Sequence, residues 1–98
     1  MKLQKFRWSK VYESQEEELI GILEAKGVTA TRWAVHEPTE LATHAYSTDT
    51  TLWCADGSVT YDFGTQKFVL QPGDGLFIPA DYGFTATSGM FGCAVYEA

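Results

Sequence analysis

Residues 72–84 read Pro-Gly-Asp-Gly-Leu-Phe-Ile-Pro-Ala-Asp-Tyr-Gly-Phe, and they carry the strongest structural signal in the chain. Both glycines beside Asp74 can adopt positive φ at little cost, and the Asp74 side chain can accept hydrogen bonds from backbone amides across the turn. Pro79 has no backbone N–H to donate, so it ends the short apolar strand that precedes it. The chain then turns, and a second strand begins at Phe84. A short strand with a tight turn at each end predicts a small β-barrel.

The size and charge of the chain limit the classes of function. Its 98 residues, 45% of them hydrophobic, suit a single domain with one core. Thirteen acidic residues against seven basic ones give a formal charge of −6. No basic stripe is available to release counterions from phosphates, so neither nucleic acid nor an anionic membrane surface is an expected partner. No apolar run approaches the roughly 20 residues of a spanning helix, and residues 1–10 lack the apolar segment of a signal peptide, so we expect a cytoplasmic location.

The two cysteines, Cys54 and Cys93, lie far apart in sequence within apolar segments. In a chain expected to stay in a reducing compartment, two buried thiols are expected rather than a disulfide.

Residues 1–27 are expected to form an arm followed by the single convincing helix. Ser14 and Glu17 have the spacing of a capping box, and the acidic residues around Glu17 complement the positive end of the helix dipole. Gly27 is suited to the position after the last helical turn.

The remaining residues, 28–98, contain short strands separated by frequent turn signals. Asp56-Gly57 is a hairpin signal, and Ser88-Gly89 is predicted to be a second turn. His44 and Tyr46 fall on one face of a strand, because side chains alternate across a strand. This pattern predicts an antiparallel sandwich or barrel.

A homodimer is also expected. Phe6 and Trp8 alternate with polar residues in the N-terminal arm, a period that suits a short edge strand. Together with Trp53 they need cover, and a barrel of this kind leaves open sheet edges that a second subunit can occupy.

The chain resembles the small single-domain cupins. The second cupin signature is a glycine-aspartate turn, a strand, a proline and a histidine; its spacing is matched by Gly73, Asp74, Ile78 and Pro79. The first signature resembles residues 44–57, and an Arg-Trp pair of these cupins is similar to Arg32-Trp33. The resemblance covers the chain after Ser14 and implies an antiparallel cupin-type β-barrel, also called a double-stranded β-helix or jelly roll, over residues 28–98. The N-terminal helix would lie outside this barrel.

The metal site that the resemblance implies is mostly replaced in this chain. Cupins use two histidines and a carboxylate from the first signature and a histidine from the second. Only the first histidine remains, as His44; the other three positions hold Tyr46, Thr50 and Phe84. A transition metal needs three or four converging nitrogen, sulfur or carboxylate donors, so we expect no metal cofactor.

The positions of the lost ligands then predict an aromatic-lined pocket for a small organic molecule. Its expected lining residues are His44, Tyr46, Leu52, Cys54 and Phe84. An apolar pocket with a few convergent polar groups is the usual form of such a site. The alternative is that these side chains fill the barrel, which would make the chain a structural or interaction module.

A metal-dependent enzyme of the oxygenase or isomerase type is the other alternative. His44, Asp49 and Cys54 are acceptable ligands by type for a divalent transition metal such as zinc, iron, manganese or nickel. His44 can also act as a general acid or base near neutral pH. No other catalytic signature is present, so the sequence favours a binding protein over an enzyme.

Overall fold

The computed structural model describes residues 2–10 and 16–98, with residues 42–44 described by their backbone only. The elements follow the order β1 (Gln4–Arg7), α1 (Glu16–Ala25), β2 (Thr31–Val35), β3 (Glu40–His44), β4 (Thr50–Asp62), β5 (Lys67–Leu70), β6 (Asp74–Ile78) and β7 (Phe84–Glu97). All strand pairs are antiparallel. Within the described residues, no helix has the length and apolar character needed to cross a membrane.

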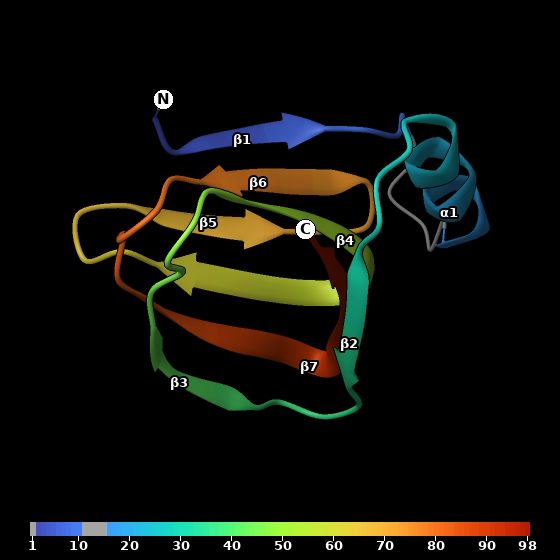
Figure 1. Ribbon diagram of the computed structural model, residues 1–98. Helices are drawn as coiled ribbons and strands as arrows, with labels where there is room; N and C mark the ends of the chain where they lie inside the picture. Colours follow the sequence, from blue (N-terminus) through green and yellow to red (C-terminus); the bar gives the residue numbers. More distant parts are fainter. Residues whose placement is uncertain (1, 11–15) are drawn as a thin grey trace.

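Two long strands, β4 and β7, are shared by both layers of the sheet (Figure 1). In one layer the strands lie in the order β1-β6-β4-β7-β2. In the other layer the second part of β4 pairs with β5 and with the first part of β7, which also pairs with β3. The predicted all-β class is therefore confirmed as an antiparallel β-sandwich with one short helix.

Gly57 and Gly92 mark the places where the shared strands pass from one layer to the other. Both have positive φ, 66° and 79°. A β-carbon added to Gly57 would lie 2.1 Å from the carbonyl oxygen of Gly92, and one added to Gly92 would lie 2.0 Å from that of Val35. Glycine is therefore required at both corners, since its backbone can approach other backbone closely.

The prediction of a hairpin at Asp56-Gly57 is wrong. These residues lie inside β4, where the register with β7 shifts between Cys54 and Asp56 and again between Gly57 and Val59. The reason is that a β-bulge and a hairpin turn both use a glycine at positive φ.

The turn predicted at Ser88-Gly89 is also wrong, because β7 continues through it. Ser88 is buried, and its hydroxyl accepts a hydrogen bond from the Thr39 amide at 2.7 Å and donates one to the Glu37 carbonyl at 2.9 Å. Gly89 gives room for Ser58, whose Oγ lies 2.0 Å from the position of an added β-carbon.

The segment around Asp74 has the predicted structure. Gly73 has a φ of 96°, and the Gln71 amide donates a hydrogen bond of 2.9 Å to Asp74 Oδ2. Strand β6 ends directly before Pro79, and β7 begins at Phe84. The two turns at the ends of β6 are thus confirmed.

Helix α1 covers the outer face of the layer whose strand order is β1-β6-β4-β7-β2. Its buried residues Leu19 and Leu23 pack against Trp53, Ala55 and Tyr96. The helix ends in a Schellman arrangement, in which the Val28 amide donates to the Leu23 carbonyl at 2.9 Å and Gly27 has a φ of 69°. The predicted role of Gly27 is confirmed, whereas Ser14 of the proposed capping box lies outside the described residues.

The N-terminal arm forms the predicted edge strand, β1, against β6. Phe6 lies over Gly75, and the Trp8 indole donates a hydrogen bond of 3.1 Å to the Asp74 carbonyl. Phe6, Trp8 and the buried Trp53 therefore obtain much of their cover from their own chain. The homodimer stays a prediction, and its apolar surface would lie elsewhere, for example at Phe91, whose side chain is 84% exposed.

Candidate small-molecule pocket

A pocket of about 450 Å³ opens between the two layers. Strands β2, β3, β4 and β7 and the segment after β3 contribute its lining, which consists of Thr31, Trp33, Leu41, Tyr46, Tyr61, Phe84, Ala86 and Glu97. Most of these side chains are aromatic or aliphatic, with a small number of polar groups among them. Pockets of this size and composition are typical of small-molecule sites.

Phe84 is the centre of the aromatic wall. Its ring centroid lies 5.5 Å from that of Tyr46 and 5.4 Å from that of Tyr61, the latter in an edge-to-face arrangement. Phe63 packs on the same ring at 5.5 Å. Because Phe84 follows the turn after Pro79, the local sequence fixes where this ring enters the interior.

The Tyr61 hydroxyl is buried and has no hydrogen-bond partner among the described residues. The side chain is 1% exposed, and this burial raises the pKa of the phenol, so the hydroxyl keeps its proton near neutral pH. A buried hydroxyl without a partner costs about 1–3 kcal/mol, and such groups are rare in folded proteins. This hydroxyl is therefore an unsatisfied polar group within the described part of the chain, on a residue that also lines the pocket.

Tyr46 and Glu97 form the second polar feature of the pocket. The Tyr46 hydroxyl donates a hydrogen bond of 2.6 Å to Glu97 Oε2. Burial, together with the nearby carboxylate, raises the pKa of Tyr46, so Tyr46 acts as a donor. Glu97 is the one charged residue in the described lining.

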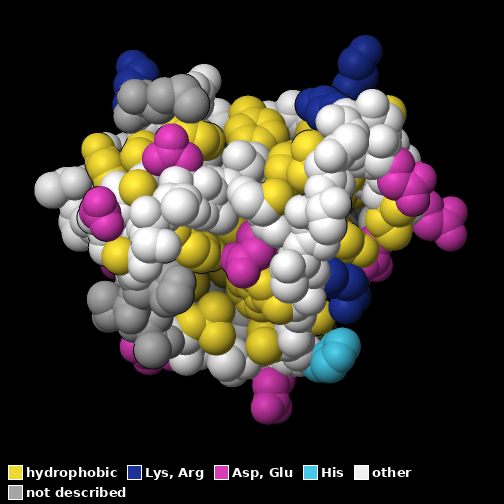
Figure 2. Space-filling view, in the orientation of Figure 1, with side chains coloured by type: hydrophobic (Ala, Val, Ile, Leu, Met, Phe, Trp, Pro, Cys, Tyr) yellow, Lys and Arg dark blue, Asp and Glu magenta, His cyan; other side chains and the backbone are white. Residues whose placement is uncertain are grey.

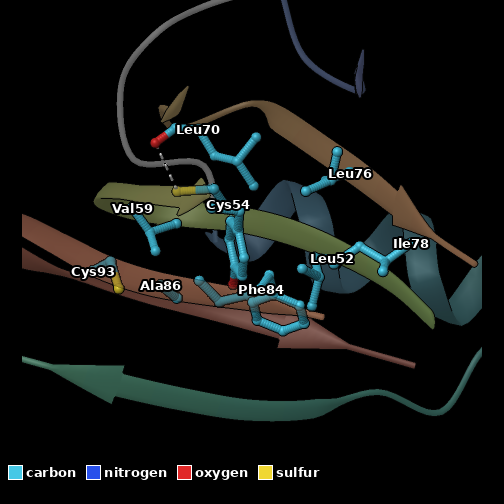
Figure 3. Close-up of a cluster of buried hydrophobic side chains, with 11 residues drawn as sticks. Leu52, Cys54, Val59, Leu70, Leu76, Ile78, Phe84, Ala86 and Cys93 are labelled. Atoms are coloured by element: carbon cyan, nitrogen blue, oxygen red, sulfur yellow. Dashed lines mark hydrogen bonds between the residues drawn. The ribbon is translucent and has the colours of Figure 1, made fainter. Parts of the chain in front are cut away.

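Two of the five predicted pocket residues line the pocket, and two others lie in the hydrophobic cluster next to it. Tyr46 and Phe84 line the pocket, whereas Leu52 and Cys54 lie in the hydrophobic cluster between the layers (Figure 3). The His44 side chain lies outside what is described; its backbone pairs with Phe84 in the ladder between β3 and β7.

Cys54 and Cys93 are both buried free thiols, as predicted. Cys54 Sγ lies 3.8 Å from the Leu70 carbonyl oxygen (Figure 3). Burial raises the pKa of Cys54 to about 12 and that of Cys93 to about 11. Both thiols are protonated at neutral pH, and neither is poised as a nucleophile.

The non-standard metal set of His44, Asp49 and Cys54 gains no support from the described side chains. Asp49 Oδ1 accepts a hydrogen bond of 2.8 Å from the Ala80 amide. The protonated Cys54 would have to lose its proton before it could bind a metal. Within the part of the chain whose side chains are described, no group of three or more His, Cys, Asp or Glu residues is placed to hold a metal ion.

Sequence reasoning missed three important lining residues, Trp33, Tyr61 and Glu97. Trp33 was noted only as part of the Arg32-Trp33 pair that resembles one in small cupins, and that pair did not indicate a pocket. The inward direction of the Tyr61 side chain depends on the bulges in β4. The sequence predicted a hairpin at Asp56-Gly57 instead of these bulges, and a hairpin there does not place Tyr61 in the interior. Glu97 is the last residue of β7, and nothing in its local sequence indicates a pocket.

The fold is that of the small cupins. The chain is similar to a DUF861 family protein from Thermotoga maritima, with 16% identity, a TM-score of 0.67, and coverage of 99% of this chain and 98% of that one. It is also similar to a cupin superfamily protein from Desulfitobacterium hafniense, with 17% identity, a TM-score of 0.61, and coverage of 98% and 74%. These likenesses confirm the predicted cupin resemblance at the level of the fold.

The same fold occurs in larger enzymes. Salicylate 1,2-dioxygenase from Pseudoaminobacter salicylatoxidans, solved with gentisate, is 16% identical with a TM-score of 0.57. The match covers 84% of this chain and 29% of the dioxygenase chain. No family model and no curated protein matches the sequence.

Proposed function

We propose that this cupin-fold protein binds a small organic molecule in the pocket between its layers, without the usual cupin metal. The observation that carries the proposal is the buried Tyr61 hydroxyl, which has no hydrogen-bond partner among the described residues, on a residue that contributes to the lining of a pocket of about 450 Å³. A bound molecule would supply the missing partner. A core evolved only for packing would be expected to use phenylalanine at this position, since an unpartnered hydroxyl destabilises a core.

The competing function, a structural module with a filled interior, is less well supported. Its core would be close-packed, with few voids larger than a water molecule. The pocket between the layers combines a mainly aromatic and aliphatic lining with a volume in the range of about 300–1,000 Å³ that is usual for small-molecule sites, and this combination favours a bound molecule.

The test is a thermal-shift screen against a broad set of metabolites, followed by calorimetry on compounds that raise the melting temperature. The Tyr61→Phe variant should unfold at the same or a higher temperature than the natural protein without ligand, because it loses no hydrogen bond that the described residues make. The same variant should lose most of the ligand-induced rise. Tyr82→Phe is the matched control, since Tyr82 is 43% exposed and outside the lining. A screen without any stabilising compound, or equal ligand responses in both variants, would argue against the proposal.

Elemental analysis of untagged protein separates this function from a metal-dependent enzyme. We expect less than one equivalent of any transition metal. A stoichiometric metal that disappears in His44→Ala would instead identify the protein as a metal-dependent cupin and overturn the metal-free proposal.

A further inference from the structure

We infer that the pocket selects an organic cation, namely a protonated amine attached to a small apolar body. This inference rests on the proposed function and adds the chemical class of the ligand. Three observations carry it: the inward direction of Glu97, the absence of a described cationic partner for that carboxylate, and the aromatic rings around it.

Glu97 lies on the core-facing side of β7. Val95 and Cys93, at alternate positions before it, belong to the cluster between the layers, whereas Tyr96 packs on the outer face under the helix. In the sheet, Glu97 pairs with Thr31 on one side and with Leu52 on the other. A glutamate at a position where the strand otherwise presents apolar side chains breaks the pattern of its own strand, and such breaks are expected at functional sites.

The Glu97 carboxylate has no cationic partner in the described part of the chain. The ion pairs found there join Lys5 and Arg7 to Asp74, Arg32 to Glu16 and Lys67 to Asp62. The hydrogen bond from Tyr46 uses one acceptor site of the carboxylate, which has about four. A partly buried carboxylate is stabilised by an opposite charge, and a ligand is free to bring that charge into the pocket.

The aromatic lining favours the same ligand. Trp33, Tyr46, Tyr61 and Phe84 surround the pocket, and the face of an aromatic ring attracts a cation within about 6 Å of its centroid. The N–H groups of an ammonium can also donate to the Tyr61 oxygen, which would give this hydroxyl its missing partner. Hydrophobic and acidic side chains lie side by side near the centre of the face shown in Figure 2. The formal charge of −6 further raises the local concentration of cations.

The test compares three probes that carry the same phenyl ring and differ in charge. These are the cation benzylammonium, the neutral benzyl alcohol and the anion benzoate. Affinities are measured by calorimetry or ligand-observed NMR at neutral pH and constant ionic strength. We expect benzylammonium to bind about tenfold more tightly than benzyl alcohol, the ratio that corresponds to about 1.4 kcal/mol, and benzoate to bind most weakly.

Two variants locate the cause of the preference. Glu97→Gln should remove the tenfold advantage of benzylammonium over benzyl alcohol, and the thermal unfolding transition of the variant reports that it is folded. Glu17→Gln makes the same charge change at an exposed position of α1 and should alter neither affinity.

The outcomes separate this inference from the proposed function. If benzyl alcohol or benzoate binds as tightly as benzylammonium, or if Glu97→Gln keeps the preference, the cation assignment is overturned while a binding pocket stands. If none of the three probes binds, the cation assignment is also overturned, and the metabolite screen with Tyr61→Phe then tests the pocket by itself.

Discussion

At the residue level, Glu16 joins the helix to the sheet. Its carboxylate accepts a hydrogen bond from the Tyr96 hydroxyl at 2.6 Å and a second one from the Arg32 guanidinium. The hydrogen bond from Tyr96, followed by that from Arg32, lowers the pKa of Glu16 below its usual value of 4.5. Glu16 therefore favours the folded state most when its carboxylate is ionised.

This contact predicts a pH dependence of stability. Because the folded-state pKa is lowered, the contribution of Glu16 is complete above its usual pKa of 4.5 and is lost as the pH falls through the folded-state value. Denaturant unfolding of the natural protein and of Glu16→Gln should show a stability difference that is constant near neutral pH and shrinks below about pH 4.5. Glu18→Gln, on the same helix but exposed, is the control. A difference that stays constant down to about pH 3 would contradict the role given to Glu16.

At the level of elements, the corner glycines determine whether β4 and β7 can serve both layers. Gly92 combines a φ of 79° with the close approach of the Val35 carbonyl from β2. Alanine at this position would be strained by its own backbone conformation and would also push β2 away from β7.

The Gly92→Ala variant should therefore be clearly less stable than a variant that suffers the conformational strain alone. Gly64→Ala is that control, because Gly64 has a φ of 89° and no atom within 4 Å of the added β-carbon. We expect Gly64→Ala to lose about 1–2 kcal/mol and Gly92→Ala to lose at least about 3 kcal/mol, as measured by urea unfolding. Equal losses in the two variants would show that the contact with Val35 is unimportant.

Some elements of the fold could be predicted from the sequence, and others could not. The end of α1 at Gly27 and the turns on both sides of β6 were predictable, because local residues determine them. The corner at Gly57 was not predictable, since the same glycine signal serves a hairpin or a bulge and only the register with β7 distinguishes the two. The same limit applies to the candidate site. Tyr46 and Phe84 were predictable from the spacing of the cupin signatures, whereas Tyr61 and Glu97 could be placed only with the register of the long strands β4 and β7.

At the level of the whole molecule, the N-terminal arm is held to the sandwich by a buried charge. Asp74 Oδ1 accepts a hydrogen bond of 2.7 Å from Arg7, and the side chains are 4% and 26% exposed, respectively. The Asp74 carboxylate also accepts from the Gln71 amide, so it fixes the turn before β6 and the strand beside β6 together.

Replacement of Asp74 by alanine should destabilise the protein by about 2–4 kcal/mol, because it removes the buried carboxylate that pairs with Arg7 and accepts a hydrogen bond from the Gln71 amide. The exchange of backbone amides in β1 should accelerate most, as followed by hydrogen exchange. Lys67→Ala is the comparison, since Lys67 is 68% exposed and pairs with Asp62 at 3.8 Å on the surface, and this variant should lose less than about 1 kcal/mol. Similar losses in the two variants would refute the anchoring role of Asp74.

The sharing of β4 and β7 between the layers also divides the pocket into two kinds of wall. Tyr61, Phe84 and Glu97 lie on the shared strands, where a change of backbone would disturb both layers at once. Trp33 and Leu41 lie on β2 and β3, which each pair with β7 alone. Substitutions in these two edge strands can therefore reshape the pocket while the polar groups on the shared strands stay in position. One half of the pocket is open to divergence, and the other half is constrained by folding.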